Sequence, residues 1–146
     1  LALACDVVIA SQSAVFVQAF SRIGLVPDAG GTYALPRLVG LSRAMGASLF
    51  ADEISAAQAV QWGMIYEAVP DADFEAHWRA RAGYLAKGPT VAYRHLKEAL
   101  HASYDNTLAE QLTLEAKLQN QCGQTRDFKE GVIAFLEKRK PQYEGR

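Results

Sequence analysis

The sequence predicts an α/β fold at the front of the chain and an all-helical region behind it. Asp6 to Ala10 is short and rich in β-branched residues, which is typical of a buried strand. Ser55 to Gln58 has the form of a capping box, so a helix is expected there, with Gly63 placed to end it. Met64 to Val69 is then expected to form an edge strand. This succession of strand, helix and strand is typical of an α/β layer.

Between these elements, further local structure is expected on either side of a turn. Leu1 to Ala4 is expected to end a helix, and Ala14 to Phe16 to add a short extended piece. A turn over Pro27 to Gly31 precedes a short helix, in which Pro36 limits how far the first turn can run. A second helix is expected from Ser42 to Phe50.

Beyond Pro70 the pattern is helical throughout. The expected helices are Asp71–Lys87, Thr90–Ser103, one that opens at a Thr107–Glu110 capping box and runs towards Gln121, and a last one capped by Thr125. The last helix carries an apolar stripe made of Phe128, Val132, Phe135 and Leu136. Such a stripe needs a surface to pack on, and we expect another subunit to supply it.

Composition excludes several classes of protein. With 15 basic and 16 acidic residues among 146, the net charge is −1, which argues against a nucleic-acid surface. No apolar run approaches the ~20 residues of a membrane span. Cys5 and Cys122 lie far apart without metal-ligand spacing, so reduced thiols in a cytoplasmic protein are expected. His77, His95 and His101 have no partners at metal-binding spacing and are expected to face solvent.

One carboxylate has a setting that favours chemistry. Asp28 lies between Pro27 and the pair Gly30-Gly31, after an apolar segment from Phe20 to Val26. On pattern alone, an aspartate here more often stabilises the N-terminus of a helix. The alternative is a proton-transfer group at the edge of an apolar wall. The glycine pair weakly favours this alternative, because missing side chains let a ligand approach the backbone.

A cationic cluster, Lys138-Arg139-Lys140, lies near the C-terminus. Such a cluster is usually a solvated helix end, and phosphate binding is the alternative.

Several segments together resemble one known family. They are Ile23–Thr32 with Leu35–Gly40, the opening Leu3–Asp6, the Ala56–Gly63 helix and the ending Phe135–Pro141. In this order they resemble the enoyl-CoA hydratase/isomerase (crotonase) superfamily, over essentially the whole chain. Within it, Ala19 to Thr32 is similar to isomerases of 2-(1,2-epoxy-1,2-dihydrophenyl)acetyl-CoA in aerobic phenylacetate degradation.

The resemblance implies the fold and the assembly. Residues 1–70 are expected to be the C-terminal part of a ClpP/crotonase β-β-α spiral, and residues 71–146 a helical trimerisation region. A homotrimer or a dimer of trimers is implied, acting on acyl-CoA substrates, with no cofactor beyond the coenzyme A of the substrate and no metal. The chain opens inside an apolar run, so a piece of a longer protein is expected. Both oxyanion-hole donors and most of the nucleotide loop would lie outside it, leaving the piece alone inactive.

The resemblance also implies roles for individual residues. Hydratases of the family use two glutamates; the first falls upstream of Leu1, and the second aligns with Phe20, which cannot activate water. The single acid/base of the isomerases matches Asp28, and Lys138 matches a lysine that reaches the CoA phosphates in some members. The expected substrate pocket consists of Phe20, Leu25, Val26, Gly30 and Gly31.

An acyl-CoA isomerase is therefore expected. The alternatives are an enoyl-CoA hydratase or a Δ3-Δ2-enoyl-CoA isomerase of fatty-acid oxidation, and a non-catalytic CoA-binding or assembly subunit. The last remains open because a fold does not fix a function.

Overall fold

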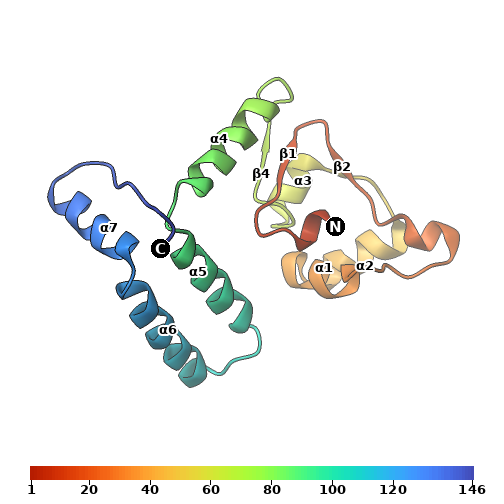
Figure 1. Ribbon diagram of the computed structural model, residues 1–146. Helices are drawn as coiled ribbons and strands as arrows, with labels where there is room; N and C mark the ends of the chain where they lie inside the picture. Colours follow the sequence, from red (N-terminus) through yellow and green to blue (C-terminus); the bar gives the residue numbers. More distant parts are fainter. The chain divides into compact units, whose positions relative to one another are not determined.

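The computed structural model describes all 146 residues, as two compact units, Leu1–Arg79 and Ala80–Arg146 (Figure 1). The division falls inside helix α4 (Phe74–Ala86). None of the helices combines the length and the apolar character that crossing a membrane requires. The functional division at residues 70 and 71 stays a prediction.

Two short sheets organise the first unit. β1 (Ile9–Ser11) pairs in parallel with β4 (Glu67–Val69), and β2 (Val15–Phe16) pairs in antiparallel fashion with β3 (Ile54–Ser55). Strands were expected in all of these places except β3. β1 begins three residues later than predicted, because the ladder starts where Ile9 meets Glu67.

The first unit also contains five helices that precede β1 or connect the strands. They are the 3-10 helices η1 (Ala2–Ala4) and η2 (Ala19–Ile23) and the α-helices α1 (Gly31–Val39), α2 (Leu41–Phe50) and α3 (Ala56–Gln61). The Ser55 hydroxyl caps α3, as predicted, by accepting from the Gln58 amide at 3.2 Å.

Pro36 does not limit α1, and that prediction is wrong. Proline removes one backbone donor, yet α1 continues past it to Val39, and the Gly40 amide still bonds to the Pro36 carbonyl at 3.0 Å. Leu35 and Val39 on either side of the proline are buried in the core. Burial of these two side chains offsets the missing hydrogen bond.

The core of the first unit gathers small and aliphatic side chains from β1, α1, α2, β3, α3 and the segment that follows α3. Its buried members are Ala10, Leu35, Val39, Ala44, Ala47, Ile54, Ala56, Ala59, Met64 and Ile65. This core fixes α1 and α2, and with them the loop that leads into α1.

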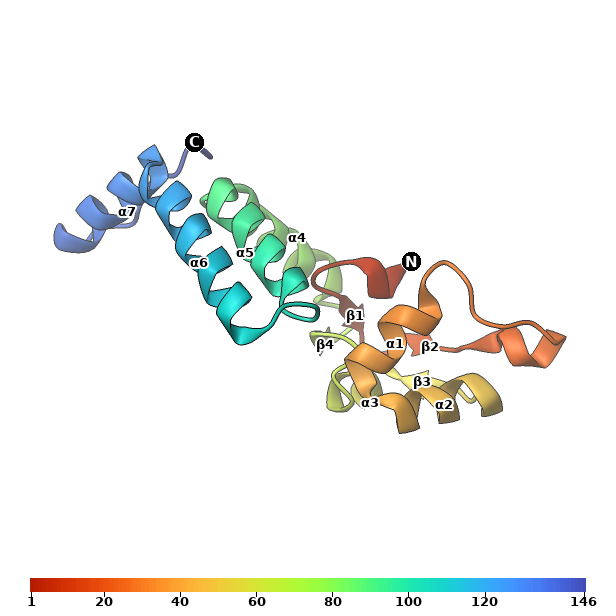
Figure 2. The same cartoon turned by 90° about the horizontal axis from the view of Figure 1, so that it is seen from below.

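The second unit contains α5 (Thr90–Ala102), α6 (Leu108–Gly123) and α7 (Arg126–Leu136). α5 and α6 lie side by side in both views (Figures 1 and 2). The predicted capping box of α6 is present: the Thr107 amide donates to Glu110 Oε2 at 2.8 Å, and the Glu110 amide to Thr107 Oγ1 at 3.4 Å. Thr125 caps α7, also as predicted.

Two expectations for the helical region need correction. α4 begins at Phe74 rather than at Asp71, because Asp71 is used in a turn and accepts a hydrogen bond from the Ser13 amide at 3.0 Å. His95 is buried rather than solvent-facing, with its Nδ1 3.3 Å from Glu98 Oε2. His77 is half-buried and bonds to Glu67 at 2.9 Å.

Candidate functional site

The loop between η2 and α1 carries the predicted catalytic aspartate. η2 ends at Gly24, whose φ of +74° is the left-handed conformation that favours glycine. The Leu25 amide donates to the Phe20 carbonyl at 2.9 Å, closing η2. Phe20 therefore lies in η2 and is bonded through its carbonyl to the start of the loop that leads to Asp28.

Arg22 ties this loop to the core helices. Its guanidinium donates to the carbonyl of Ala51, the residue that caps the C-terminus of α2. A cation at the C-terminal end of a helix also interacts favourably with the helix dipole. η2, from which the loop starts, is thus attached to the C-terminal end of α2.

Asp28 itself opens a tight turn. The Gly31 amide donates to the Asp28 carbonyl at 2.8 Å, and the two residues between them have positive φ, +49° at Ala29 and +80° at Gly30. Positive φ at both central positions is the signature of a type I′ turn. The turn delivers the chain directly into α1 at Gly31.

The structure separates Asp28 from the capping role considered above. The N-cap of α1 is Gly30, and the first turn of α1 contains no acidic residue. The Gly30 carbonyl receives the first helical amides, from Tyr33 and Ala34, at 3.0 and 2.9 Å. Asp28 is exposed two residues before this cap, so its carboxylate is available to a ligand.

The five residues of the expected pocket lie on or beside this one loop. Leu25 and Val26 are 60% and 71% exposed, and Phe20 is half-buried. A Cβ added at Gly31 would lie 3.4 Å from Pro27 Cβ, so a side chain there would press on the turn. Gly30 requires glycine for its φ rather than for space, since nothing lies within 4 Å of its added Cβ. Their role as a substrate pocket stays a prediction.

Lys138 lies in the second unit, just after α7. Its φ is +54°, a left-handed conformation that is uncommon outside glycine. Its amide bonds to the Phe135 carbonyl at 3.3 Å, and the next amide, of Arg139, bonds to the Ala134 carbonyl at 3.0 Å. This pair of bonds is a Schellman motif with lysine in the position usually held by glycine.

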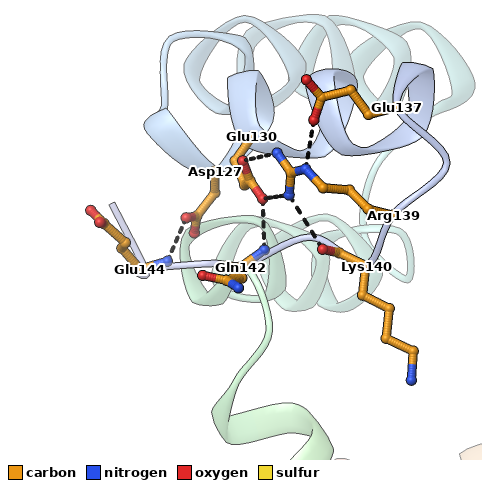
Figure 3. A network of polar contacts seen from close by, with 7 residues as sticks. All are labelled: Asp127, Glu130, Glu137, Arg139, Lys140, Gln142 and Glu144. Carbon is orange, nitrogen blue, oxygen red and sulfur yellow. Dashed lines mark hydrogen bonds and ion pairs between the residues drawn. The ribbon is translucent and has the colours of Figure 1, made fainter.

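The Arg139 guanidinium contacts two carboxylates and the Lys140 carbonyl (Figure 3). Its Nη1 and Nη2 contact the two oxygens of Glu130 at 2.6 and 3.0 Å, and its Nε contacts Glu137 Oε2 at 2.6 Å. The amide of Gln142 adds a further bond to Glu130 Oε1 at 2.8 Å. Arg139, and then the Gln142 amide, lower the pKa of Glu130 from its ordinary 4.5 to about 2.

The predicted cationic cluster therefore contains two kinds of residue. Arg139 is paired, whereas Lys138 and Lys140 are exposed, and the Lys140 side chain points away from the network in Figure 3. Sequence reasoning missed Glu130 and Glu137 as the partners of Arg139. The spacing of Glu130, nine residues before Arg139, gives no local signal, because the contact depends on the chain folding back after α7.

A second feature missed from the sequence is the buried Asp127 in the first turn of α7. Its carboxylate accepts from the amides of Glu144 and Gly145 at 2.7 and 2.9 Å, and its own amide donates to the Arg146 carbonyl at 3.1 Å. The C-terminal segment is thereby held against α7.

An apolar groove of about 800 Å³ lies within the second unit, formed by α5, α6, α7 and the C-terminal segment. The predicted stripe on α7 lines it, and its side chains stay exposed, 82% for Phe135 and 73% for Leu136. His95, Cys122 and Asp127 are among its polar lining residues. No group of three or more His, Cys, Asp or Glu side chains is arranged to hold a metal ion.

The chain is similar over its whole length to proteins with assigned names. A family model described as Enoyl-CoA hydratase/isomerase matches residues 1–146. A Rhodobacter capsulatus protein named "Probable enoyl-CoA hydratase" is 62% identical over 100% of this chain and 57% of its own length. The 1,2-epoxyphenylacetyl-CoA isomerase of Escherichia coli is 47% identical over 100% of this chain and 56% of its own length.

Solved structures agree. The crystal structure of an enoyl-CoA hydratase from Bacillus anthracis matches with a TM-score of 0.92 and 35% identity, over 99% of this chain and 56% of that one. The chain thus spans just over half the length of the relatives it matches.

Proposed function

This chain belongs to the enoyl-CoA hydratase/isomerase family, with the crotonase fold, and from that premise we propose that it carries the acid/base residue of an acyl-CoA isomerase. The substrate proposed is the ring epoxide of phenylacetyl-CoA, which the enzyme converts to the ring-expanded oxepin. The 47% identity to a 1,2-epoxyphenylacetyl-CoA isomerase supports this substrate class.

One observation carries the choice of isomerisation. Asp28 is the exposed carboxylate on the loop from η2 to α1, while Phe20, in η2 before that loop, has no group that can activate water. A single carboxylate can take a proton from one carbon and return it to another on the same face of the substrate. Addition of water, in contrast, needs a group that holds and activates the water molecule.

In this mechanism Asp28 acts on the carbon next to the thioester carbonyl. The carboxylate accepts a proton there, the electron pair of the C–H bond passes into an enolate, and the protonated Asp28 returns the proton at a ring carbon. The ring expands because the C–C bond shared by the epoxide and the six-membered ring breaks and its electron pair becomes part of the double bonds of the oxepin, so no atom is gained or lost. The type I′ turn fixes the backbone at Asp28, and with it the point from which the carboxylate reaches the substrate. Lys138 is proposed to bind the phosphates of CoA through its exposed ammonium group.

A hydratase is the second candidate, and the 62% identity to a protein named "Probable enoyl-CoA hydratase" favours it. This candidate differs from the first in one measurable way. A hydratase places an oxygen atom from solvent in its product, whereas an isomerase does not.

The decisive experiment compares wild type and Asp28→Asn as full-length gene products. Each is supplied with the ring epoxide of phenylacetyl-CoA and with crotonyl-CoA in ¹⁸O-labelled water, and the products are analysed by mass spectrometry. We expect wild type to isomerise the epoxide without incorporating ¹⁸O, and Asp28→Asn to lose roughly 10²–10⁴-fold in kcat.

The matched control is Asp52→Asn, which removes an exposed aspartate of the same unit outside the loop. It should retain wild-type kcat. Comparable ¹⁸O incorporation with crotonyl-CoA would favour the hydratase, and full turnover by Asp28→Asn would exclude Asp28 as the acid/base.

We also propose that copies of this protein assemble through the exposed stripe on α7, as a homotrimer or a dimer of trimers. Apolar side chains as exposed as Phe135 and Leu136 mark an interaction surface. Phe135→Asp should lower the mass measured by light scattering to that of smaller species. Phe135→Leu, which keeps the surface apolar, should leave the mass unchanged; an unchanged mass in Phe135→Asp would argue against this surface.

A further inference from the structure

We infer that Arg139 and Glu130 are positioning residues that hold Lys138 in place for the phosphates of CoA. This inference rests on the proposed role of Lys138. It assigns the arginine of the Lys138-Arg139-Lys140 cluster a function other than direct phosphate binding.

The first step is the backbone of Lys138. A lysine in the left-handed conformation is strained, and such a residue persists only when its surroundings hold it there. The Schellman bonds of Lys138 and Arg139 hold it from the side of α7. The side chain of the next residue, Arg139, restrains Lys138 further.

The second step is the side chain of Arg139, adjacent to Lys138. It makes a two-bond contact with Glu130 on α7 and a third bond with Glu137. A bidentate arginine–carboxylate pair fixes orientation as well as distance. Glu130 in turn accepts the Gln142 amide, so the chain is pinned to α7 on both sides of Lys140.

The third step is the charge balance. Arg139 pairs with two carboxylates, Glu130 on α7 and Glu137 next to Lys138 in sequence, and lowers their combined charge from −2 to −1 (Figure 3). Without Arg139 these carboxylates would attract the ammonium group of Lys138 and repel a phosphate. Arg139 therefore has two effects on Lys138. It restrains the backbone of Lys138, and it pairs with the carboxylates of Glu130 and Glu137 that would otherwise attract the Lys138 ammonium group.

The test uses two substrates for the full-length gene product: an acyl-CoA, and the corresponding acyl-pantetheine, which lacks the phosphates. The variants are Lys138→Ala, Arg139→Ala, the double variant and Glu130→Gln, with Lys129→Ala as the matched control. Lys129 is an exposed lysine on α7, beside Glu130 in sequence.

We expect Lys138→Ala to raise KM for acyl-CoA roughly tenfold with kcat unchanged. Arg139→Ala should reproduce most of this increase, and Glu130→Gln a smaller part. The double variant should be no worse than Lys138→Ala, because both changes remove one function. KM for acyl-pantetheine should not change in any variant, which a general loss of structure would not permit, and Lys129→Ala should match wild type.

Two results would overturn the inference in different ways. A raised KM in Lys138→Ala with a normal KM in Arg139→Ala overturns the positioning role and leaves the proposed phosphate contact standing. An unchanged KM in Lys138→Ala overturns both. If wild type turns over neither substrate, calorimetric Kd values for CoA and pantetheine replace KM and decide the question independently of the proposed reaction.

Discussion

The two units of this chain are stabilised by different means. The first buries a cluster of ten apolar residues drawn from both sheets and from α1, α2 and α3. In the second, Leu118 and Ala134 are the only buried apolar residues, and the other buried side chains are the polar His95 and Asp127. Helix caps and carboxylate contacts are correspondingly frequent in the second unit.

The two units are therefore expected to differ in the substitutions that they tolerate. The first unit has its own core, which fixes α1, the helix that directly follows the positive-φ turn at Ala29 and Gly30. A unit with little core needs another surface to cover its apolar groove, and until then its geometry depends on local polar contacts. Four experiments, from the largest expected effect to the smallest, test this contrast.

The largest effect is expected in the core of the first unit. Leu35→Ala removes a side chain that is 3% exposed and should lower the free energy of unfolding by roughly 2–5 kcal/mol. Leu41→Ala, at a leucine that is 66% exposed on the next helix, should cost less than about 0.5 kcal/mol. Denaturant unfolding measures both. Equal losses of unfolding free energy in the two variants would show that the buried core is not the main source of stability of the first unit.

In the second unit, the loss of a single helix cap is expected to have the next largest effect on stability. Thr107→Ala removes the capping box of α6 and should lower stability by roughly 0.5–2 kcal/mol, measured as a lower Tm. Thr113→Ala, on the same helix but away from its end, is the control. A Tm for Thr107→Ala equal to that of the control would mean that packing, not capping, holds α6.

Replacing Lys138 with glycine is expected to raise stability, unlike the two substitutions above. Glycine adopts positive φ without strain, so Lys138→Gly should raise stability by about 1 kcal/mol relative to Lys138→Ala. Both variants lose the ammonium group and should show the same increase in KM for acyl-CoA. A Tm that does not differ between the two variants would show that the left-handed backbone carries no strain.

The smallest effect is expected in the dependence of stability on acidic pH. The pKa of Glu130 lies at about 2, below its ordinary 4.5, so its contribution to stability is complete above pH 4.5 and disappears as the pH falls towards 2. The Tm difference between wild type and Glu130→Gln should therefore shrink over that interval. A difference that stays constant from pH 7 to pH 2 would exclude the Arg139 contact as its source.

Much of the fold could be predicted from the sequence, because it depends on local signals. Caps at Ser55, Thr107 and Thr125 place three helices at their observed starts, and the family and its crotonase fold are confirmed. Pro36 was misjudged because the sequence does not show how deeply its neighbours are buried.

In the candidate site, too, features that depend on local sequence could be predicted, and features that depend on distant contacts could not. The Asp28 turn was visible in the order of proline, aspartate and glycine, although its Ala29 in positive φ was not. The partners of Arg139 and the burial of Asp127 were missed, because both depend on the chain returning over α7. The roles of Asp28, the five pocket residues and Lys138 remain predictions.

The parallel pair of β1 and β4 has a consequence for the order of folding. Ile9 pairs with Glu67, so this ladder joins two strands separated in sequence by most of the first unit, including the loop that carries Asp28. Contacts between residues this far apart in sequence form slowly, because loop closure must precede them. We expect the hairpin of α1 and α2 to form early and the β1–β4 ladder to form late. On a ribosome, the loop that carries Asp28 would then be synthesised well before the strand β4 that closes its unit.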